Sequence, residues 1–466
     1  MNQMSKIAIL SSASGGGAGI AAKRICDALN HLGNFQADFI DIVALGEAVP
    51  ASVTLNDSSS NREYTDTHYT AEYPGYVRGW VVALLSSYDV INVHWAPYLV
   101  TTSELIALAK MKRRILITMH DFYYCTGGCH YPAGCTGQMF SCVGCPQVAP
   151  IKFSRADVMA AYREKAELLG FANVHISAPS KYLVDAVVST GIISSDRAHV
   201  IRNIYHPEDL FFGDKQNVKS HVLLVADSLV ERRKGMRLAL AALGQATAKY
   251  TDGNLIVHLV GQMDNELERL CAEHRINAVF HGRIKEHEKL AAVYRNSGIL
   301  LTCSYEDNWP NVLVEGGAYG VVPVVGSGHG CEEFCSVFGI GHVVADYTPE
   351  SFSETILKCI ETYPSNEMLQ VFATCVRDSH LACNVAVTYA STITDISTEG
   401  VQQKTQDRPR KDVYVVSNSY RKLVSQNGTS RIDLVTVGGF SPRSREFSGY
   451  GFEVSVYRSR EKLHFN

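Results

Sequence analysis

The sequence predicts an α/β protein with two doubly wound domains in tandem and a small β-rich appendage at the C-terminus. Short runs of Val, Ile and Leu alternate with amphipathic segments along most of the chain, which is typical of parallel sheets covered by helices on both faces. The alternation occurs in two series that meet near residue 216. The length of 466 residues is too great for one ordinary domain and sufficient for two large cores.

The first series, residues 1–215, is expected to form the N-terminal domain. It begins with an apolar strand, a glycine-rich turn and a helix that ends near Gly33. The polar stretch 50–75 is rich in Ser, Asn, Thr and Tyr and predicts a long loop. Strands are expected at 6–12, 36–42, 89–95 and 113–121, and helices at 77–87 and 102–111.

The second series, residues 216–395, is expected to form the C-terminal domain. Its buried strands are expected at 221–228, 254–261, 278–284, 298–304, 321–327 and 341–345. Two doubly wound domains in tandem place a cleft between them, and the carboxyl ends of both sets of strands face that cleft. Residues 396–466 are expected to be a linker followed by the β-rich appendage.

Composition and charge narrow the class of protein. Hydrophobic residues make up 46% and charged residues 19% of the chain, as in a soluble globular protein. The net charge of −4 is uneven, because residues 401–466 hold twelve Lys and Arg against six Asp and Glu. This basic appendage suits an anionic membrane surface, although a solvated tail explains it equally well, and we expect no nucleic-acid partner. The N-terminus lacks a signal-peptide pattern, which predicts a cytoplasmic protein with an optional peripheral contact with the cytoplasmic membrane.

The segment 305–325, YEDNWPNVLVEGGAYGVVPVV, has the features of a diphosphate site. A strand ends, a turn follows, and a helix begins near Asn311, so the first-turn backbone N–H groups of Asn311, Val312 and Leu313 would point at an anion. Glu315, one turn further, could reach ribose hydroxyls. The alternative is that Glu315 is simply favoured by the helix dipole.

This segment resembles the C-terminal signature of the retaining GT-B glycosyltransferases of family 4, also called group 1, in which two acidic residues are spaced E-x7-E. Asp307 and Glu315 have that spacing, with Asp in place of the first Glu, and the adjacent Glu306 is a candidate to share its role. The resemblance implies a GT-B fold and retaining transfer from a nucleoside-diphosphate sugar without a catalytic metal. It also implies that Glu315 binds the donor ribose.

A basic cluster, Arg232, Arg233 and Lys234, lies between a strand and a helix in the segment 228–243. Fixed positive charge at that place would stabilise a departing nucleoside diphosphate. The pair Lys234–Gly235 is similar to the Lys-Gly pair of the family, whereas Ser228 stands where family members carry Arg. A solvated charge run before a helix is the alternative.

Two features of the first series are candidates for the other wall of the cleft. His120 lies at the C-terminal end of the strand expected at 113–121, where an open α/β sheet binds its ligands, and the resemblance places the matching His beside the donor sugar; His94 is a second candidate. The turn SSASGGGAGI does not satisfy G-x-G-x-x-G, because residue 20 is Ile. We expect Gly16 and Gly17 to lie near the donor, with a ligand-free tight turn as the alternative.

Thirteen cysteines occur in the chain, and five of them lie between residues 125 and 145. An odd number without an export signal argues against a disulfide framework. The set Cys129, Cys135, Cys142 and Cys145, with one C-x-x-C pair, could hold a structural Zn²⁺; an iron–sulfur cluster, a redox pair or free thiols are the alternatives. The HD, TGGC and CP elements of this stretch resemble glycosyltransferases from exopolysaccharide and colanic-acid-type gene clusters.

Together these features predict a retaining hexosyltransferase. It would use a nucleoside-diphosphate sugar and a saccharide or lipid-linked saccharide acceptor, in exopolysaccharide or lipopolysaccharide biosynthesis. His120, Lys234, Glu315 and Asp307 are the expected catalytic residues. A nucleotide-sugar epimerase or phosphorylase on the same frame, and a catalytically degenerate GT-B protein that binds a nucleotide or a partner, remain as alternatives, because Ser228 and Asp307 depart from the family pattern.

Overall fold

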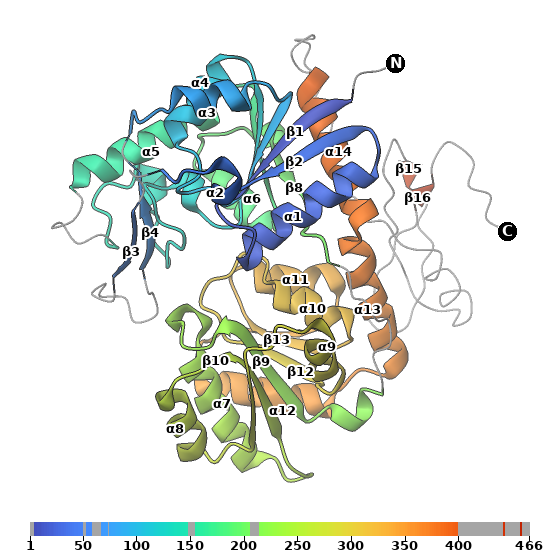
Figure 1. Cartoon of the computed structure of the whole chain (residues 1–466). Coiled ribbons are helices and arrows are strands. Elements are labelled where there is room, and N and C mark those ends of the chain that lie inside the picture. The colour runs from blue at the N-terminus through green and yellow to red at the C-terminus, as the bar shows by residue number, and fades with distance from the viewer. Residues whose placement is uncertain are drawn as a thin grey trace.

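The chain forms two α/β lobes stacked one above the other (Figure 1). The computed structural model describes residues 4–49, 53–57, 67–72, 74–147, 154–205 and 214–398, together with the short strands 441–442 and 457–458. Each lobe is built on a six-stranded parallel sheet with helices on both faces. The prediction of two doubly wound domains is therefore confirmed.

The N-terminal lobe has the strand order β2-β1-β5-β6-β7-β8, with every neighbouring pair parallel. The strands are β1 (Ser5–Leu10), β2 (Phe35–Ile40), β5 (Val90–Val93), β6 (Arg114–Thr118), β7 (Val174–Ala178) and β8 (Ala198–Val200). The helices are α1 (Gly16–His31), α2 (Ile42–Leu45), α3 (Gly79–Leu85), α4 (Thr102–Lys110), α5 (Arg155–Gly170) and α6 (Lys181–Ser189). The order reverses between β1 and β5, so the loops after these two strands frame a crevice.

The C-terminal lobe has the strand order β11-β10-β9-β12-β13-β14, again parallel throughout. The strands are β9 (His221–Ser228), β10 (Ile256–Gln262), β11 (Ala278–Gly282), β12 (Ile299–Thr302), β13 (Val322–Gly326) and β14 (His342–Val344). The helices are α7 (Met236–Lys249), α8 (Asn265–Glu273), α9 (His287–Arg295), α10 (Asn311–Ala318), α11 (Gly330–Phe338), α12 (Pro349–Glu361) and α13 (Asn366–His380). Here the order reverses between β9 and β12.

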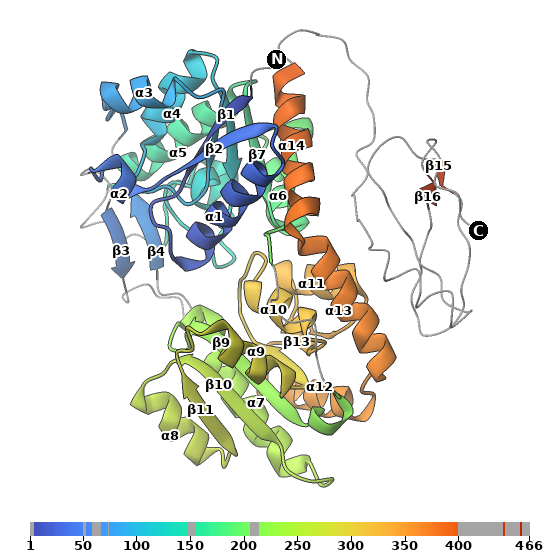
Figure 2. The same cartoon turned by 45° about the vertical axis from the view of Figure 1, so that its right-hand side comes forward.

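The last helix of the lobes, α14 (Ala382–Thr398), returns to the N-terminal lobe (Figures 1 and 2). Its apolar side chains, Tyr389 and Ile393 among them, pack into the same core as Ile7 and Ile9 of β1. The chain therefore crosses between the lobes twice, near residue 205 and near residue 381. The two crossings touch, because the backbone N–H of Tyr205 donates to the carbonyl of His380 at 2.9 Å. Although α14 falls mainly within the range 216–395, it belongs by packing to the N-terminal lobe.

One prediction for the N-terminal lobe is wrong. The stretch 50–75, expected to be a long loop, contains an antiparallel hairpin of β3 (Val53–Asp57) and β4 (Thr67–Ala71). Tyr69 and Thr70 of β4 are residue types that favour strands, and Tyr69 makes a further bridge to Cys129. The single pair β15 (Ser441–Pro442) and β16 (Tyr457–Arg458) is described at the C-terminus. The rest of the expected appendage lies outside the described residues.

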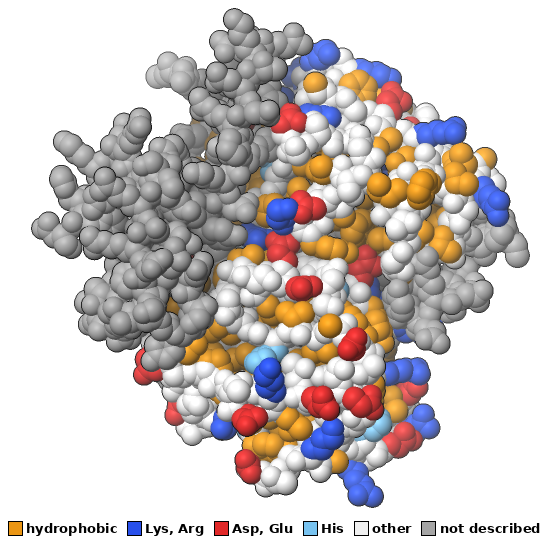
Figure 3. All heavy atoms as spheres, turned by 180° about the vertical axis from the view of Figure 1, so that it is seen from behind, with side chains coloured by type: hydrophobic (Ala, Val, Ile, Leu, Met, Phe, Trp, Pro, Cys, Tyr) orange, Lys and Arg blue, Asp and Glu red, His pale blue; other side chains and the backbone are white. Residues whose placement is uncertain are grey.

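The surface seen from behind mixes charge and apolar side chains (Figure 3). Over the C-terminal lobe, acidic and basic side chains are interspersed on this face. Large apolar side chains that are exposed include Trp80 and Leu84 on α3. Of the helices within the described ranges, none combines the length and the apolar character needed to cross a bilayer.

Candidate active site

The interface between the lobes, where the sequence predicts the cleft, brings together the loops that follow β1 and β6 on one side and β9 and β12 on the other. Asn308, in the loop after β12, donates from Nδ2 to the backbone carbonyl of His120 at 3.2 Å, and its Oδ1 accepts from the hydroxyl of Ser180. A Cβ added to Gly17 would lie 3.8 Å from Nδ2 of Asn311. The glycine turn and the start of α10 therefore face each other across the cleft.

Gly235 allows the basic segment after β9 to approach the end of β12. Its φ is +65°, and an added Cβ would lie 2.0 Å from the carbonyl oxygen of Cys303. A side chain at that position would collide with backbone, so only glycine fits. This close approach sets Lys234 beside Asp307.

Asp307 is the centre of a buried charge cluster. Its Oδ2 lies 2.6 Å from Nζ of Lys234 and 3.3 Å from a guanidinium nitrogen of Arg233. Arg233 also bonds Glu231 through Nε at 2.9 Å. Burial alone would raise the pKa of Asp307, but the attraction of Lys234 and Arg233 outweighs it and lowers the pKa to about 2. The carboxyl is therefore ionised throughout the physiological range.

The three basic residues of this segment lie in different environments. Arg233 is buried, donates to the carbonyl of Glu306 at 2.7 Å, and stacks on the ring of Tyr131 at 3.9 Å. Lys234 keeps 21% of its side chain exposed. Arg232 is exposed to solvent. Lys234 is therefore the cation of the cluster that a ligand in the cleft can reach, while Arg233 braces the loops around it.

The residues expected to bind the donor around the first turn of α10 also differ in exposure, some being accessible and others buried. Asn311 and Val312 are partly exposed, and their backbone N–H groups fall in the first turn, which helical bonds do not satisfy. Leu313 is 1% exposed, lies in the core of the lobe, and bonds Pro310 through its N–H. Glu315 accepts from the hydroxyl of Tyr294 at 2.8 Å, and burial raises its pKa.

Glu306 contacts the other lobe. Its Oε2 accepts the backbone N–H of Ala133 at 2.8 Å, so this carboxylate holds the cysteine-rich loop of the other lobe against the C-terminal lobe. Sequence reasoning placed Glu306 with the donor, because adjacent residues in a turn cannot be assigned a direction from their order alone.

His94 and His120 form a hydrogen-bonded chain with Asn92, and its geometry fixes their tautomers. Nδ2 of Asn92 donates to the carbonyl of Leu116 and to the hydroxyl of Thr118, so its Oδ1 accepts from Nε2 of His94 at 3.0 Å. Nδ1 of His94 is then bare and accepts from Nε2 of His120 at 2.9 Å. His120 is left with an unprotonated Nδ1.

Both imidazoles are neutral at neutral pH. Burial lowers the pKa of His94 well below its usual value, and burial lowers the pKa of His120 to about 4. His94 is 2% exposed, whereas His120 is partly exposed. His120 is therefore the end of the chain that the cleft can reach, and it offers a neutral hydrogen-bond acceptor there.

A second contact between the lobes depends on Glu333 at the start of α11. Its carboxylate accepts the backbone N–H groups of Lys181 and Tyr182 at 2.9 and 2.7 Å. It also pairs with the guanidinium of Arg202 at 3.0 Å. A carboxylate at the N-terminus of α6 is favoured by the helix dipole as well as by these bonds. No local sequence signal marks Glu333, because its partners are more than 130 residues away.

The cysteine-rich loop forms part of the cleft wall. Asp121 accepts from Nδ1 of His130 at 2.7 Å, and Nε2 of His130 bonds the hydroxyl of Thr70 at 2.9 Å. The loop then presents Tyr131 to Arg233. The sequence gave no sign that this loop also contacts the other lobe.

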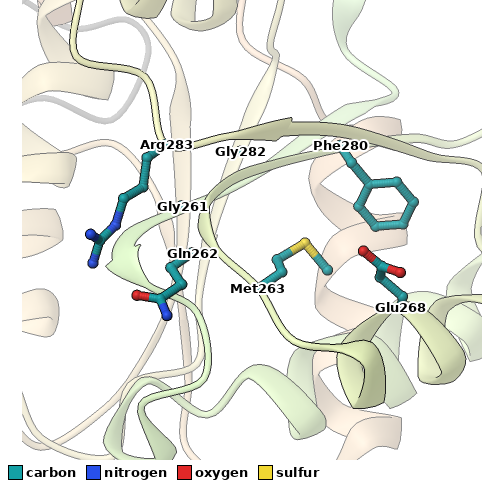
Figure 4. A pocket seen from close by; sticks show the side chains of 7 residues that line it. All are labelled: Gly261, Gln262, Met263, Glu268, Phe280, Gly282 and Arg283. Carbon is teal, nitrogen blue, oxygen red and sulfur yellow. The ribbon is translucent and has the colours of Figure 1, made fainter.

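An open pocket of about 450 Å³ lies at the carboxyl ends of β10 and β11 (Figure 4). Arg283 and Gln262 stand on one side of it, and Phe280, Met263 and Glu268 on the other. Gly261 and Gly282 complete the lining. The pocket lies on the same edge of the sheet as Lys234 and α10. It therefore extends the candidate site along this edge, away from the cleft.

In each lobe the strand order reverses at one point, and the two points of reversal face one another. This arrangement of two doubly wound lobes defines the GT-B class of glycosyltransferase folds. Residues 208–373 match the family model described as group 1 glycosyl transferases, so this part of the chain is a domain of that family. The resemblance noted in the sequence is thereby confirmed at the level of family and fold.

The chain is also similar to known glycosyltransferases in sequence and in fold. WcaC of Escherichia coli strain K12, whose name assigns it to colanic acid biosynthesis, is 26% identical over 254 residues. That match covers 51% of this chain, and the chain spans 58% of the length of WcaC. Anabaena Alr3699/HepE, solved in complex with UDP, superposes with a TM-score of 0.55 at 15% identity, covering 84% of this chain and 100% of that one. A glycosyltransferase of Rickettsia africae gives 0.55 at 13% identity over 85% and 99%. At these identities the two structures establish the fold alone.

Proposed function

We propose that the protein is a retaining glycosyltransferase that moves a hexose from a nucleoside-diphosphate sugar to a saccharide or lipid-linked saccharide acceptor. The observation that supports this most directly is the placement of Lys234, a partly exposed cation, beside Asp307 in the loop that leads into α10. A diphosphate at this position would receive both the charge of Lys234 and the first-turn N–H groups of α10.

The remaining site residues then take definite roles. Glu315, at the far end of the first turn, would accept from the ribose hydroxyls, and the pocket lined by Gln262 and Arg283 would take the base. Gly17, whose added Cβ would lie 3.8 Å from Nδ2 of Asn311, would approach the donor from the N-terminal lobe. Nδ1 of His120 would accept a hydrogen bond from a hydroxyl of the donor sugar.

Transfer in this arrangement depends on the leaving group. Lys234 and the α10 dipole stabilise the charge that develops on the departing diphosphate, which is the largest contribution available to such a site. Closure of the lobes excludes water, so that the acceptor rather than water captures the sugar. His120 is neutral and does not add a competing positive charge beside the oxocarbenium-like sugar.

The acceptor class follows from a different observation. The similarity to WcaC supports a saccharide or lipid-linked saccharide acceptor in the synthesis of a cell-surface polysaccharide. A lipid-linked acceptor would place the protein at the inner face of the cytoplasmic membrane. Equal binding of the full chain and of residues 1–398 to anionic vesicles would show that the basic appendage makes no contribution to this contact.

Nucleotide binding is the first test. We would record thermal unfolding with UDP, GDP, ADP and dTDP, each without and with Mg²⁺. A ligand at 100 times its Kd stabilises the protein by about 2.7 kcal/mol, which shifts the midpoint by several degrees. One diphosphate should produce this shift without metal. Glu315→Ala should abolish it, and the exposed control Glu354→Ala should preserve it. The absence of any shift would reject the proposed donor site.

One observation favours a second candidate. Asp307 neutralises Lys234 through an ion pair at 2.6 Å, which suits a protein that retains the fold as a binding module without turnover. Incubation with a panel of nucleotide sugars separates these two candidates from each other and from an epimerase. Release of nucleoside diphosphate with acceptor supports transfer, isomerisation of the sugar indicates an epimerase, and binding without either product indicates the degenerate protein.

A further inference from the structure

The cysteine-rich loop between β6 and α5 surrounds a small cavity of its own. Four of its thiols line this cavity, which has a volume of about 30 Å³. The four are Cys129, Cys135, Cys142 and Cys145. The cavity has room for a single ion or water molecule, which is too little for an iron–sulfur cluster.

The backbone of the loop turns sharply to bring these thiols together. Ala133, Ser141 and Cys142 have φ values of 51°, 57° and 54°, in the left-handed region that non-glycine residues rarely occupy. Gly134 and Gly144 are also left-handed, at 74° and 70°. A loop with so many unfavourable conformations needs a strong local interaction to hold it.

Backbone N–H groups are directed at two of the sulfur atoms. The N–H of Gly127 donates to Sγ of Cys142 at 3.3 Å, and that of Gly137 donates to Sγ of Cys135 at 3.3 Å. Such bonds stabilise negative charge on sulfur, as a thiolate ligand requires. Gly137 can approach in this way because an added Cβ would lie only 3.1 Å from Sγ of Cys135.

We propose that Cys129, Cys135, Cys142 and Cys145 bind one Zn²⁺ as tetrahedral thiolates. Four sulfur ligands from one short, irregular segment are typical of a structural zinc site. Zinc binding would release the thiol protons to solvent and form four Zn–S bonds without any change of oxidation state. Within the described part of the chain, no three His, Cys, Asp or Glu side chains already stand close enough to hold a metal ion. Rotation of the partly exposed Cys135 and Cys145 side chains into the cavity is therefore part of the proposal.

Zinc would stabilise the wall of the interlobe cleft. Tyr131 and Ala133 lie between the first two ligands, and they contact Arg233 and Glu306 of the other lobe. The metal would thus hold the loop that braces the charge cluster, although none of its ligands belongs to that cluster. This proposal is independent of the proposed transfer reaction.

The test is metal content, measured by mass spectrometry on the full chain after removal of loosely bound metal by gel filtration. We expect about one Zn²⁺ per chain in the wild type. Cys142→Ser and Cys145→Ser should lower this content at least several-fold. Cys383→Ser should not, because Cys383 is exposed and lies far from the loop in sequence. Replacement by Co²⁺ should give the thiolate-to-cobalt charge-transfer absorption of a sulfur-coordinated site.

Other outcomes would overturn the proposal. They are a wild type that holds no more zinc than Cys142→Ser, a Cys142–Cys145 disulfide in the freshly purified chain, and the visible absorption of an iron–sulfur cluster. If the serine variants fail to fold, the metal content and the cobalt spectrum of the wild type still decide the question. Limited proteolysis gives a readout that does not depend on activity: removal of zinc with a chelator should speed cleavage within residues 125–147 and leave the C-terminal lobe unchanged.

Discussion

Replacing Lys234 with Met tests the charge cluster most directly. Methionine keeps most of the length of the lysine stem and removes the ammonium group. Because Lys234 is the partly exposed cation of the cluster and Arg233 is buried against Tyr131, the substitution should remove the contact with the diphosphate and leave the supporting loops in place. Arg237→Met, at the second residue of α7 with a side chain 64% exposed, is the matched control.

The expected size of the effect follows from the contacts of Asp307. A charge-assisted hydrogen bond contributes about 1.5–3 kcal/mol, so losing one contact with the diphosphate should raise its Kd by about 10- to 150-fold. The attraction of Lys234 and Arg233 outweighs the effect of burial and lowers the pKa of Asp307 to about 2 from the usual 3.8, a net stabilisation of the carboxylate of roughly 2 kcal/mol. Lys234 and Arg233 share it, and Arg233 retains its part. The unfolding free energy should therefore fall by only about 1–2 kcal/mol.

The Kd is measured by calorimetric titration with the nucleoside diphosphate that stabilises the wild type. The free energy of unfolding is measured by denaturant unfolding. We expect weak binding with nearly normal stability for Lys234→Met, and wild-type values of both for Arg237→Met. Equal Kd values for Lys234→Met and the wild type would refute the assignment of Lys234 to the diphosphate. An equal loss of binding in Arg237→Met would show that the effect is general electrostatics.

Three further substitutions test the packing around the cleft. Glu333→Gln should lower the unfolding free energy by about 1–3 kcal/mol, because it weakens charge-assisted bonds between the lobes; a change no larger than that of the exposed Glu354→Gln would contradict this. Gly235→Ala should cost more than about 2 kcal/mol through its collision with the backbone of β12, whereas Gly191→Ala, with φ +73° and open space, should cost about 1 kcal/mol. Burial lowers the pKa of His380 to about 3 from 6.5, so the unfolded chain binds the extra proton first as pH falls. This histidine should remove about 2 kcal/mol of stability between pH 7 and pH 5. Denaturant unfolding of His380→Asn at the two pH values should show a drop smaller by that amount, and an unchanged drop would refute the pKa.

The sheets could be predicted because their signal is local. The strand expected at 221–228 coincides with β9, and the helix expected at 102–111 coincides with α4 except for its last residue. The hairpin of β3 and β4 was missed because its Ser- and Asn-rich surroundings have the composition of a loop, while its pairing joins residues up to 18 positions apart. The bridge between Tyr69 and Cys129 is a tertiary contact that supports the hairpin and that local composition does not indicate.

The sequence could predict only those site residues that follow the end of a strand. His120, Lys234 and Asp307 each follow a strand whose carboxyl end faces the cleft, so topology alone places them together. The sequence could not predict that Arg233 is buried while Lys234 is partly exposed. The burial of Arg233 depends on Tyr131, about 100 residues away in the other lobe. The same holds for Glu306, whose direction is decided by Ala133.

The double crossing of the chain between the lobes has a consequence for the modularity of the protein. The C-terminal lobe is an insertion within the N-terminal one rather than a cassette attached at its end, because α14 completes the core around β1. A chimaera that exchanges only residues 214–380 would keep each core intact, whereas a graft that ends the chain at either crossing would leave the first lobe without Tyr389 and Ile393. Recombination among such proteins would therefore need two breakpoints to keep each core within one parent, because a single breakpoint would pair β1 of one parent with α14 of the other.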